Sequence, residues 1–261
     1  MTSLYAGFDL GASSTKVVVI DSNKKIIAST ISRSGLDYSE TSKMCLEKIL
    51  DENGLLKDQI KGSVASGYGR SMVDIADKTM TEISCHAKGC YNYFPGEITI
   101  VDIGAQDCKI IKLDKDGKRT EFKMNRKCAA GTGAFLEEIS AKLEIPLSDF
   151  NSMAEKSTKI VELGAYCTVF TSTEILDKLR HGLKAEDVIM GVFRSVVKRI
   201  LEMDPLNGDI VLSGGVIHHN LLIARIFEEY LKKPVSTPEA PQLMGAYGAA
   251  LYAFMGGQVV A

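Results

Sequence analysis

The sequence has little net charge and no long uninterrupted apolar run. Its 261 residues contain 31 Lys and Arg and 33 Asp and Glu, a net charge of −2. No overall field therefore favours nucleic acid or an anionic membrane. Residues 240–261 carry no charge, but Pro241, Gln242 and several glycines interrupt them, which argues against a membrane span. Their small residues instead favour a helix packed closely against other backbone.

A secretion signal and a Walker A loop are also missing. The N-terminus runs directly into the strand-like LYAGFDLG, so we expect a cytoplasmic protein whose six cysteines are free or metal-bound rather than disulfide-bonded. The pattern GxxxxGK[ST] does not occur, so any phosphate loop must be of another type. The length allows one large domain or two lobes.

The first chemical motif is DLGASSTK, residues 9–16, which lies between the apolar runs YAGFD and VVVID. The β-branched enrichment predicts strand, tight turn, strand. The loop is either a polar hairpin or a phosphate loop. In the second interpretation Gly11 allows close approach, the backbone and hydroxyls face the oxyanions, and Lys16 supplies charge. The candidate ligand-binding residues are Ala12, Ser13, Ser14, Thr15 and Lys16.

The same arrangement returns later in the chain. The run ITIV leads into DIGAQD, so Asp102 and Gly104 repeat Asp9 and Gly11, and each motif is followed by strand, turn and strand. Two similar lobes, each presenting an Asp-Gly turn to a shared cleft, would grip one phosphate chain from both sides. This duplication favours the phosphate-loop interpretation of both motifs.

Two cysteines precede helical patterns. Cys128 lies in KCAAGTGAFLEEI, and Cys167 lies ahead of a helix expected to have Ser172 or Thr173 as its cap. A thiolate there would sit near the positive end of a helix dipole, although two buried small side chains are the alternative. Cys85, His86 and Cys90 are assigned to a packed helix rather than a metal site.

Two further stretches concern the nucleoside and the core. GDIVLSGGV predicts strand, glycine turn and helix start, an arrangement suited to a nucleotide lying across the turn at Gly214 and Gly215. His218 and His219 are interpreted as solvated or cap-forming. Residues 185–202 have the apolar spacing of a long helix. Arg70, after the turn SGYG, is either a functional or a solvated charge.

These motifs, taken in this order, resemble those of the actin, Hsp70 and sugar-kinase superfamily. DLGASSTK would be the first phosphate loop, DIGAQD the second, and SGGV the adenosine loop. The resemblance implies an α/β, two-lobed, ribonuclease H-like ATPase fold with duplicated lobes around a nucleotide cleft. Residues 1–97 would form lobe I, with a closing helix at 244–261 packed back on it, and residues 98–243 would form lobe II.

Within that superfamily the chain is most similar to the ATP-dependent activators of 2-hydroxyacyl-CoA dehydratases, which are related to the ATPase subunits of benzoyl-CoA reductase. SGYGR, SCHAKG, DIGAQD, NRKCAAGTGAF and YCTVFTSTE carry the resemblance. Ala105 departs from it, because the family commonly has glycine there. The resemblance implies a homodimer that shares one [4Fe–4S] cluster, with Cys128 and Cys167 as each subunit's ligands and the other four cysteines structural.

The resemblance also implies an ATP-driven one-electron donor. Asp9 and Asp102 would hold Mg²⁺ largely through water, Gly104 and residues 12–16 would bind phosphates, and Gln106 would orient the attacking water. Gly214, Gly215 and Gln242 would border the nucleoside of ATP or ADP. The implied partners are an acceptor iron–sulfur protein, either a dehydratase component or a double-cubane cluster protein, and a donor such as ferredoxin or flavodoxin. No nucleic acid or membrane is expected.

Two rival functions stay open at this point. A small-molecule kinase of the same superfamily could use Asp102 or Asp107 as its base, but the chain leaves little room for a substrate domain, and a kinase gives no reason for the two matched cysteines. A nucleotide-switched binding module without metal is the other rival.

Overall fold

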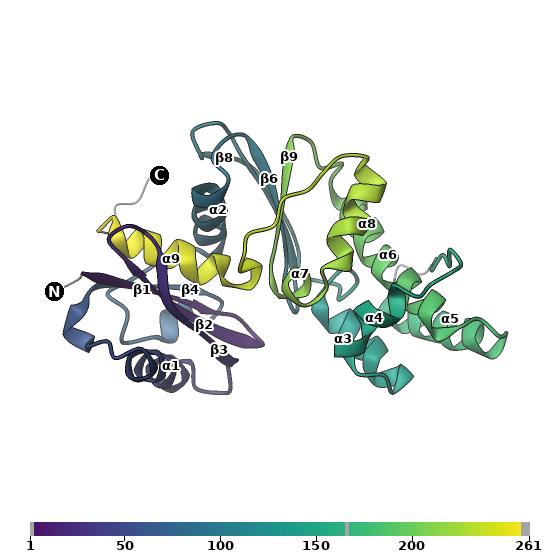
Figure 1. Ribbon diagram of the computed structural model, residues 1–261, viewed down its shortest axis with the longest axis horizontal. Coiled ribbons are helices and arrows are strands. Elements are labelled where there is room, and N and C mark those ends of the chain that lie inside the picture. Colours follow the sequence, from purple (N-terminus) through teal and green to yellow (C-terminus); the bar gives the residue numbers. More distant parts are fainter. Residues whose placement is uncertain (1–2, 165–166, 257–261) are drawn as a thin grey trace. The chain divides into compact units, whose positions relative to one another are not determined.

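The computed structural model describes residues 3–164 and 167–256. The chain divides into two compact units, each built on one sheet with helices against it (Figure 1). Unit 1 comprises Met1–Gly96, Leu113–Arg119 and Gln242–Ala261, and unit 2 comprises Glu97–Lys112 and Thr120–Pro241.

The sheet of unit 1 has the strand order β3-β2-β1-β4-β5. Its strands are β1 (Leu4–Leu10), β2 (Ser14–Asp21), β3 (Ile26–Arg33), β4 (Ile60–Gly67) and β5 (Lys78–Thr79), and its helices are α1 (Tyr38–Glu52), α2 (Glu82–Tyr93) and α9 (Met244–Phe254), with short 3₁₀ turns at Lys57–Gln59 and Arg70–Met72. β1 pairs antiparallel with β2 and parallel with β4. The strand–turn–strand expected around DLGASSTK is confirmed.

Successive residues of β1 face opposite sides of the sheet, and each side packs against a different helix. Leu4, Ala6, Phe8 and Leu10 join a core with the apolar face of α1. Gly7 points to the opposite face, where a Cβ would lie only 2.1 Å from the Ala246 carbonyl oxygen of α9. Figure 1 shows α9 and α1 on opposite faces of this sheet.

Helix α9 packs backbone against backbone, as its small residues predict. A Cβ at Gly248 would lie 1.8 Å from the Cys85 carbonyl oxygen of α2, and one at Gly89 would lie 2.3 Å from the Met244 carbonyl oxygen. The last part of the predicted closing helix, residues 257–261, lies outside the described residues. In the part of the chain that the structure describes, no helix combines the length and apolarity that crossing a membrane requires.

The sheet of unit 2 has the strand order β8-β7-β6-β9. Its strands are β6 (Ile98–Ile103), β7 (Cys108–Leu113), β8 (Arg119–Asn125) and β9 (Asp209–Ser213). Its helices are α3 (Gly133–Leu143), α4 (Phe150–Ala154), α5 (Thr168–Arg180), α6 (Ala185–Met203), α7 (Gly215–His219) and α8 (Leu222–Leu231), with a 3₁₀ turn at Leu147–Asp149. A further 3₁₀ turn, Pro241–Leu243, lies where the chain passes from unit 2 to unit 1. The second strand–turn–strand motif and the long helix are confirmed.

One core holds unit 2 together. Buried side chains of β6 and β7 pack with the apolar faces of α3, α6 and α8, and Phe150 and Phe193 meet edge to face at the centre, with ring centroids 6.2 Å apart. This core fixes the carboxyl end of β6, where the second phosphate turn begins.

Candidate nucleotide and thiol sites

The first predicted phosphate turn presents a buried carboxylate near the end of β1. Asp9 is 3% exposed and is paired across the strands with Lys16, whose Nζ lies 3.2 Å from Asp9 Oδ2. Asp9 Oδ1 is buried and has no hydrogen-bond partner among the described residues. Gly67 and Gly245 enclose this carboxylate, since a Cβ at either would approach Asp9 side-chain atoms to 3.0 Å or less.

The loop of this turn is held from behind by Ser34. Its Oγ donates to the Gly11 carbonyl at 2.6 Å and lies 3.1 Å from Thr15 Oγ1, while its backbone N–H donates to the Ser13 carbonyl. Ala12 and Ser13 are exposed and Ser14 is partly exposed, whereas Thr15 is fully buried. The tip of the loop is therefore open to a ligand, and the Thr15 hydroxyl braces the loop from inside.

The second turn presents Asp102 in a denser ionic environment. Asp102 is 2% exposed, its Oδ1 accepts from Ser213 Oγ at 3.1 Å, and its Oδ2 lies 3.4 Å from Lys109 Nζ. Lys109 is 1% exposed and also contacts Asp107 Oδ1 at 2.6 Å. Gln106 lies in the turn itself and is exposed.

The predicted adenosine loop lies directly against the end of β6. Gly214 has φ +97°, and a Cβ there would lie 2.3 Å from the Ile103 carbonyl oxygen, so only glycine fits. The Gly214 N–H donates to the Pro241 carbonyl at 3.0 Å, and Gly215 begins α7. Gln242, which follows Pro241, has a buried Oε1 without a partner within the described ranges.

The second phosphate turn is hydrogen-bonded to the start of α3. The Gly133 N–H donates to the Gly104 carbonyl at 2.9 Å, and the Ala134 N–H donates to the Ala105 carbonyl at 2.7 Å. These two amides are among the donors that a helix N-terminus leaves without internal partners. The turn that carries Gln106 and the helix that follows Cys128 are thus joined directly by backbone hydrogen bonds.

The six thiols fall into two groups by exposure. Cys45, Cys85, Cys90 and Cys108 are buried, whereas Cys128 and Cys167 are partly exposed. Burial raises the pKa of Cys85 to about 12 and also raises the pKa values of Cys108 and Cys45, which keeps these thiols protonated. Since metals bind thiolates, Cys128 and Cys167 are the chemically suited pair.

Cys128 lies in a compact loop between β8 and α3. Asn125 Nδ2 donates to the carbonyls of Cys128 and Ala130 at 3.1 and 3.2 Å. Thr132 closes the loop, because its N–H and its Oγ1 both donate to the Ala129 carbonyl. The position of the Cys128 backbone is therefore set by neighbours on both sides.

The predicted start of the helix after Cys167 is wrong. α5 begins at Thr168 with Cys167 itself as the N-cap residue, five residues before Ser172, the nearer of the two expected caps. Thr171 Oγ1 and Ser172 Oγ donate to the carbonyls of Cys167 and Thr168, so these hydroxyls bond backward within the first turn instead of capping it. Cys167 is consequently closer to the helix end than the sequence suggested.

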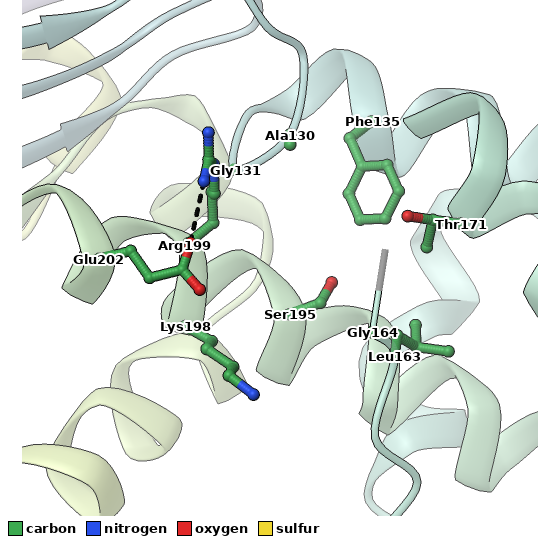
Figure 2. Close-up of a pocket in the computed structure, with 10 residues that line it drawn as sticks. All are labelled: Ala130, Gly131, Phe135, Leu163, Gly164, Thr171, Ser195, Lys198, Arg199 and Glu202. Carbon is green, nitrogen blue, oxygen red and sulfur yellow. Dashed lines mark hydrogen bonds and ion pairs between the residues drawn. The ribbon is translucent and has the colours of Figure 1, made fainter. Parts of the chain in front are cut away.

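A pocket in unit 2 lies beside both cysteine segments. Figure 2 shows its lining, which comprises Ala130, Gly131, Phe135, Leu163, Gly164, Thr171, Ser195, Lys198, Arg199 and Glu202. Gly131 follows Cys128 by three residues, and Thr171 follows Cys167 by four. Ser172 Oγ also donates to Glu138 Oε1 of α3 at 3.2 Å. The two cysteine-bearing segments therefore lie side by side.

The structure adds functional candidates that the sequence did not single out. Lys109 contacts both acids of the second turn, and Asn125 braces the Cys128 loop. A signal for Lys109 existed, because Asp9–Lys16 and Asp102–Lys109 have the same seven-residue spacing. Arg70, which was left open, donates to the Gly67 carbonyl at 3.0 Å and so supports the turn beside Asp9.

Comparison with known proteins gives a consistent set of relatives. The model of the BadF/BadG/BcrA/BcrD ATPase family matches residues 6–253. The activator of lactoyl-CoA dehydratase from Anaerotignum propionicum is 40% identical over 255 residues, which is 97% of this chain and 98% of that protein.

Solved structures agree with the sequence relatives. Component A of the (R)-2-hydroxyglutaryl-CoA dehydratase of Acidaminococcus fermentans superposes with a TM-score of 0.92 at 35% identity, covering 98% of this chain and 100% of that chain. The 2-hydroxyisocaproyl-CoA dehydratase activator of Clostridium difficile with bound ADPNP gives 0.89 at 37% identity, covering 99% and 96%. The α/β, actin- and Hsp70-like fold expected from the sequence is confirmed.

Proposed function

The chain belongs to the BadF/BadG/BcrA/BcrD ATPase family, and we propose that it is an ATP-hydrolysing iron–sulfur activator that passes a low-potential electron to a partner metalloenzyme. The partner would be a 2-hydroxyacyl-CoA dehydratase or a double-cubane cluster protein. The observation that carries the proposal is the division of the thiols: the partly exposed pair, Cys128 and Cys167, belongs to the unit that contains the second phosphate turn.

The nucleotide would be held by groups whose environments suit it. Residues 12–14 offer an open loop tip, and Lys16 is 14% exposed at its side chain, so both can be reached by phosphate oxygens. The buried, unpartnered oxygen of Asp9 fits a hard cation or its bound water, which supports a role beside Mg²⁺. The orphaned Oε1 of Gln242 fits a donor on the nucleoside.

The set of cluster ligands would be completed by the cysteines of a second copy of the chain. A [4Fe–4S] cluster takes four thiolates and would supply a one-electron carrier. Each chain offers two partly exposed thiols, so a homodimer gives the required number. The N-terminus of α5, which begins immediately after Cys167, would stabilise negative charge on that sulfur.

Coupling would run through the turn and α3. Gln106 would orient the attacking water, because an amide both donates and accepts hydrogen bonds. Any shift of its turn would be transmitted to Gly133 and Ala134, whose amides bind the turn's carbonyls, and from there to the Cys128 loop. A small free-energy difference between nucleotide states would suffice to change the reduction potential of the cluster, since about 1.4 kcal/mol corresponds to roughly 59 mV for a one-electron couple.

The kinase alternative has less support. A ROK-family glucokinase from Streptomyces griseus shares the fold with a TM-score of 0.57 at only 12% identity. A likeness that distant concerns the fold alone. A kinase also gives no reason for the partly exposed Cys128 and Cys167, each close before a helix.

An electron-transfer assay tests the proposal. The full-length protein, purified and reduced without oxygen, is mixed with lactoyl-CoA dehydratase, and electron transfer and ATP hydrolysis are followed together. We expect transfer with MgATP and little with ADPNP. Equal transfer without nucleotide, or transfer of phosphate from ATP to a small molecule in place of hydrolysis, would contradict the proposal.

A further inference from the structure

The two units carry the same ion pair at the same place in their first two strands. In unit 1, Lys16 Nζ lies 3.2 Å from Asp9 Oδ2. In unit 2, Lys109 Nζ lies 3.4 Å from Asp102 Oδ2. Both lysines follow their aspartate by seven residues, with the acid on the first strand and the base on the second. The duplication therefore extends beyond the Asp-Gly turns to a lysine.

The two lysines nevertheless have different surroundings. The side chain of Lys16 is 14% exposed, so a ligand can reach it from solvent. The side chain of Lys109 is 1% exposed and has two carboxylate neighbours, with Asp107 Oδ1 at 2.6 Å and Asp102 Oδ2 at 3.4 Å. A buried ammonium is costly unless such partners compensate its lost hydration. Lys109 is thus held by the acids of the second turn, whereas Lys16 is accessible to solvent.

The two acids bracket the second predicted phosphate turn. Asp102 is the last residue but one of the buried strand before it, and the Asp107 carbonyl accepts from the Gly104 N–H at 2.9 Å, which closes the turn. Gln106 lies between them, exposed, and its position depends on the backbone of this turn. Lys109 therefore fixes both ends of the short segment that carries Gln106.

We propose that Lys109 is a positioning residue for ATP hydrolysis, acting through Asp102 and Asp107 to hold Gln106 in the orientation that hydrolysis needs. This inference rests on the proposed function. Lys16 and Lys109 then have separate roles: the first contacts the nucleotide, and the second orders the turn beneath it. Loss of Lys109 should slow turnover and leave nucleotide affinity nearly intact, because Lys109 acts on the turn, whereas the proposed phosphate contacts of the first loop come from Lys16 and residues 12–15.

The test combines Lys109→Met with Asp107→Asn in a double-mutant cycle on the full-length protein. We expect Lys109→Met to lower kcat for ATP hydrolysis by about 10- to 100-fold, the cost typical of a small misplacement. The calorimetric Kd for MgADP should stay within about threefold of the wild-type value. Because the two residues act as one unit, the double variant should lose no more kcat than Lys109→Met alone.

A second lysine of β7 provides a matched control. Lys112 also contacts two carboxylates, Glu121 at 2.8 Å and Asp204 at 2.9 Å, but these acids lie away from the turn. Lys112→Met should reduce thermal stability and leave kcat of the folded protein unchanged.

Several outcomes would overturn the role of Lys109. They are an unchanged kcat in Lys109→Met, a rise in the MgADP Kd that matches the fall in kcat, or losses that multiply in the double variant. If Lys109→Met does not fold, Asp107→Asn decides alone, and full kcat in that variant contradicts the inference. A wild-type protein that hydrolyses no ATP would instead refute the proposed function.

Discussion

At the scale of single residues, the two predicted phosphate turns differ in the hydrogen-bond and ion-pair partners of their aspartates. Among the residues that the structure describes, one buried oxygen of Asp9 has no partner, whereas both oxygens of Asp102 have contacts, to Ser213 and Lys109. A buried acceptor without a partner costs free energy, which a ligand can recover. We infer that Asp9 is the aspartate more ready to receive a cation and that Asp102 is pre-organised by protein contacts.

Gln106 gives the sharpest test at this scale. Its side chain is exposed in a turn whose backbone is fixed by Gly104, Asp107 and the start of α3. Gln106→Ala should therefore leave the fold and MgATP binding intact and reduce kcat by about 10- to 100-fold through loss of water positioning. Steady-state hydrolysis and binding calorimetry measure the two effects. Ser152→Ala, on α4, is a control that should change neither, and unaltered turnover in Gln106→Ala would count against its role.

The residue types and places of the nucleotide candidates could be predicted from the sequence, but their contacts could not. Apolar runs that end in Asp-x-Gly place Asp9 and Asp102 at the ends of buried strands without any structure. The inward Thr15 hydroxyl depends on Ser34, nineteen residues away, and the contact of Asp102 with Ser213 spans more than a hundred residues. No local pattern encodes such pairings.

At the scale of elements, α3 is the piece that connects the two chemical motifs. The sequence predicts a turn at residues 102–107 and a helix after Cys128, but it does not reveal that the helix donates two backbone hydrogen bonds to that turn. Backbone bonds of this kind leave no signature in side-chain types. The start of α5 was misplaced for a related reason, because Ser and Thr hydroxyls can cap a helix or bond backward inside it.

A buried ionic cluster ties β7 and β8 to the end of α6, and its pH dependence can be predicted. Asp204 accepts from Lys123 and Lys112 at 2.7 and 2.9 Å and from the Leu206 N–H at 2.8 Å. Burial alone would raise the pKa of Asp204, but these hydrogen bonds outweigh it and hold the pKa at about 2. The depressed pKa stabilises the fold above the unfolded value near 4, and this stabilisation disappears as pH falls from about 4 to 2.

Asp204→Asn should consequently lower the free energy of unfolding at pH 7 by about 2 kcal/mol. The difference from wild type should shrink as the pH is lowered toward 3, because the wild-type carboxylate then begins to lose its advantage over the unfolded state. Urea titrations at several pH values measure it. A difference that is constant from pH 7 to pH 3 would show that the charge of Asp204 is not what stabilises this corner.

At the scale of the whole molecule, the chain repeats one plan in two compact units. The repeat is visible in the sequence as two Asp-Gly turns, each followed by strand, turn and strand, and these elements form in both units. The hairpin tip Leu113–Arg119 clusters with unit 1, where the Tyr91 hydroxyl donates to the Lys115 carbonyl at 2.8 Å. Sequence periodicity cannot reveal that assignment, because it arises from contacts with residues distant in the sequence, such as Tyr91 on α2.

The proposed role of the cysteines requires two chains. One chain offers two partly exposed thiols and a [4Fe–4S] cluster takes four thiolates, so the proposed metal site needs a second molecule, whereas the proposed nucleotide residues are supplied by one chain. The central claim is therefore that Cys128 and Cys167 together bind iron in a dimer.

Iron and sulfide content after anaerobic purification and reconstitution tests this claim most directly. We predict roughly four irons and four sulfides per two wild-type chains. Cys128→Ala should bind almost none while keeping its MgADP affinity, and the buried Cys45→Ala control should retain the wild-type content. A folded, ATP-hydrolysing dimer without iron, or full iron content in Cys128→Ala, would contradict the account.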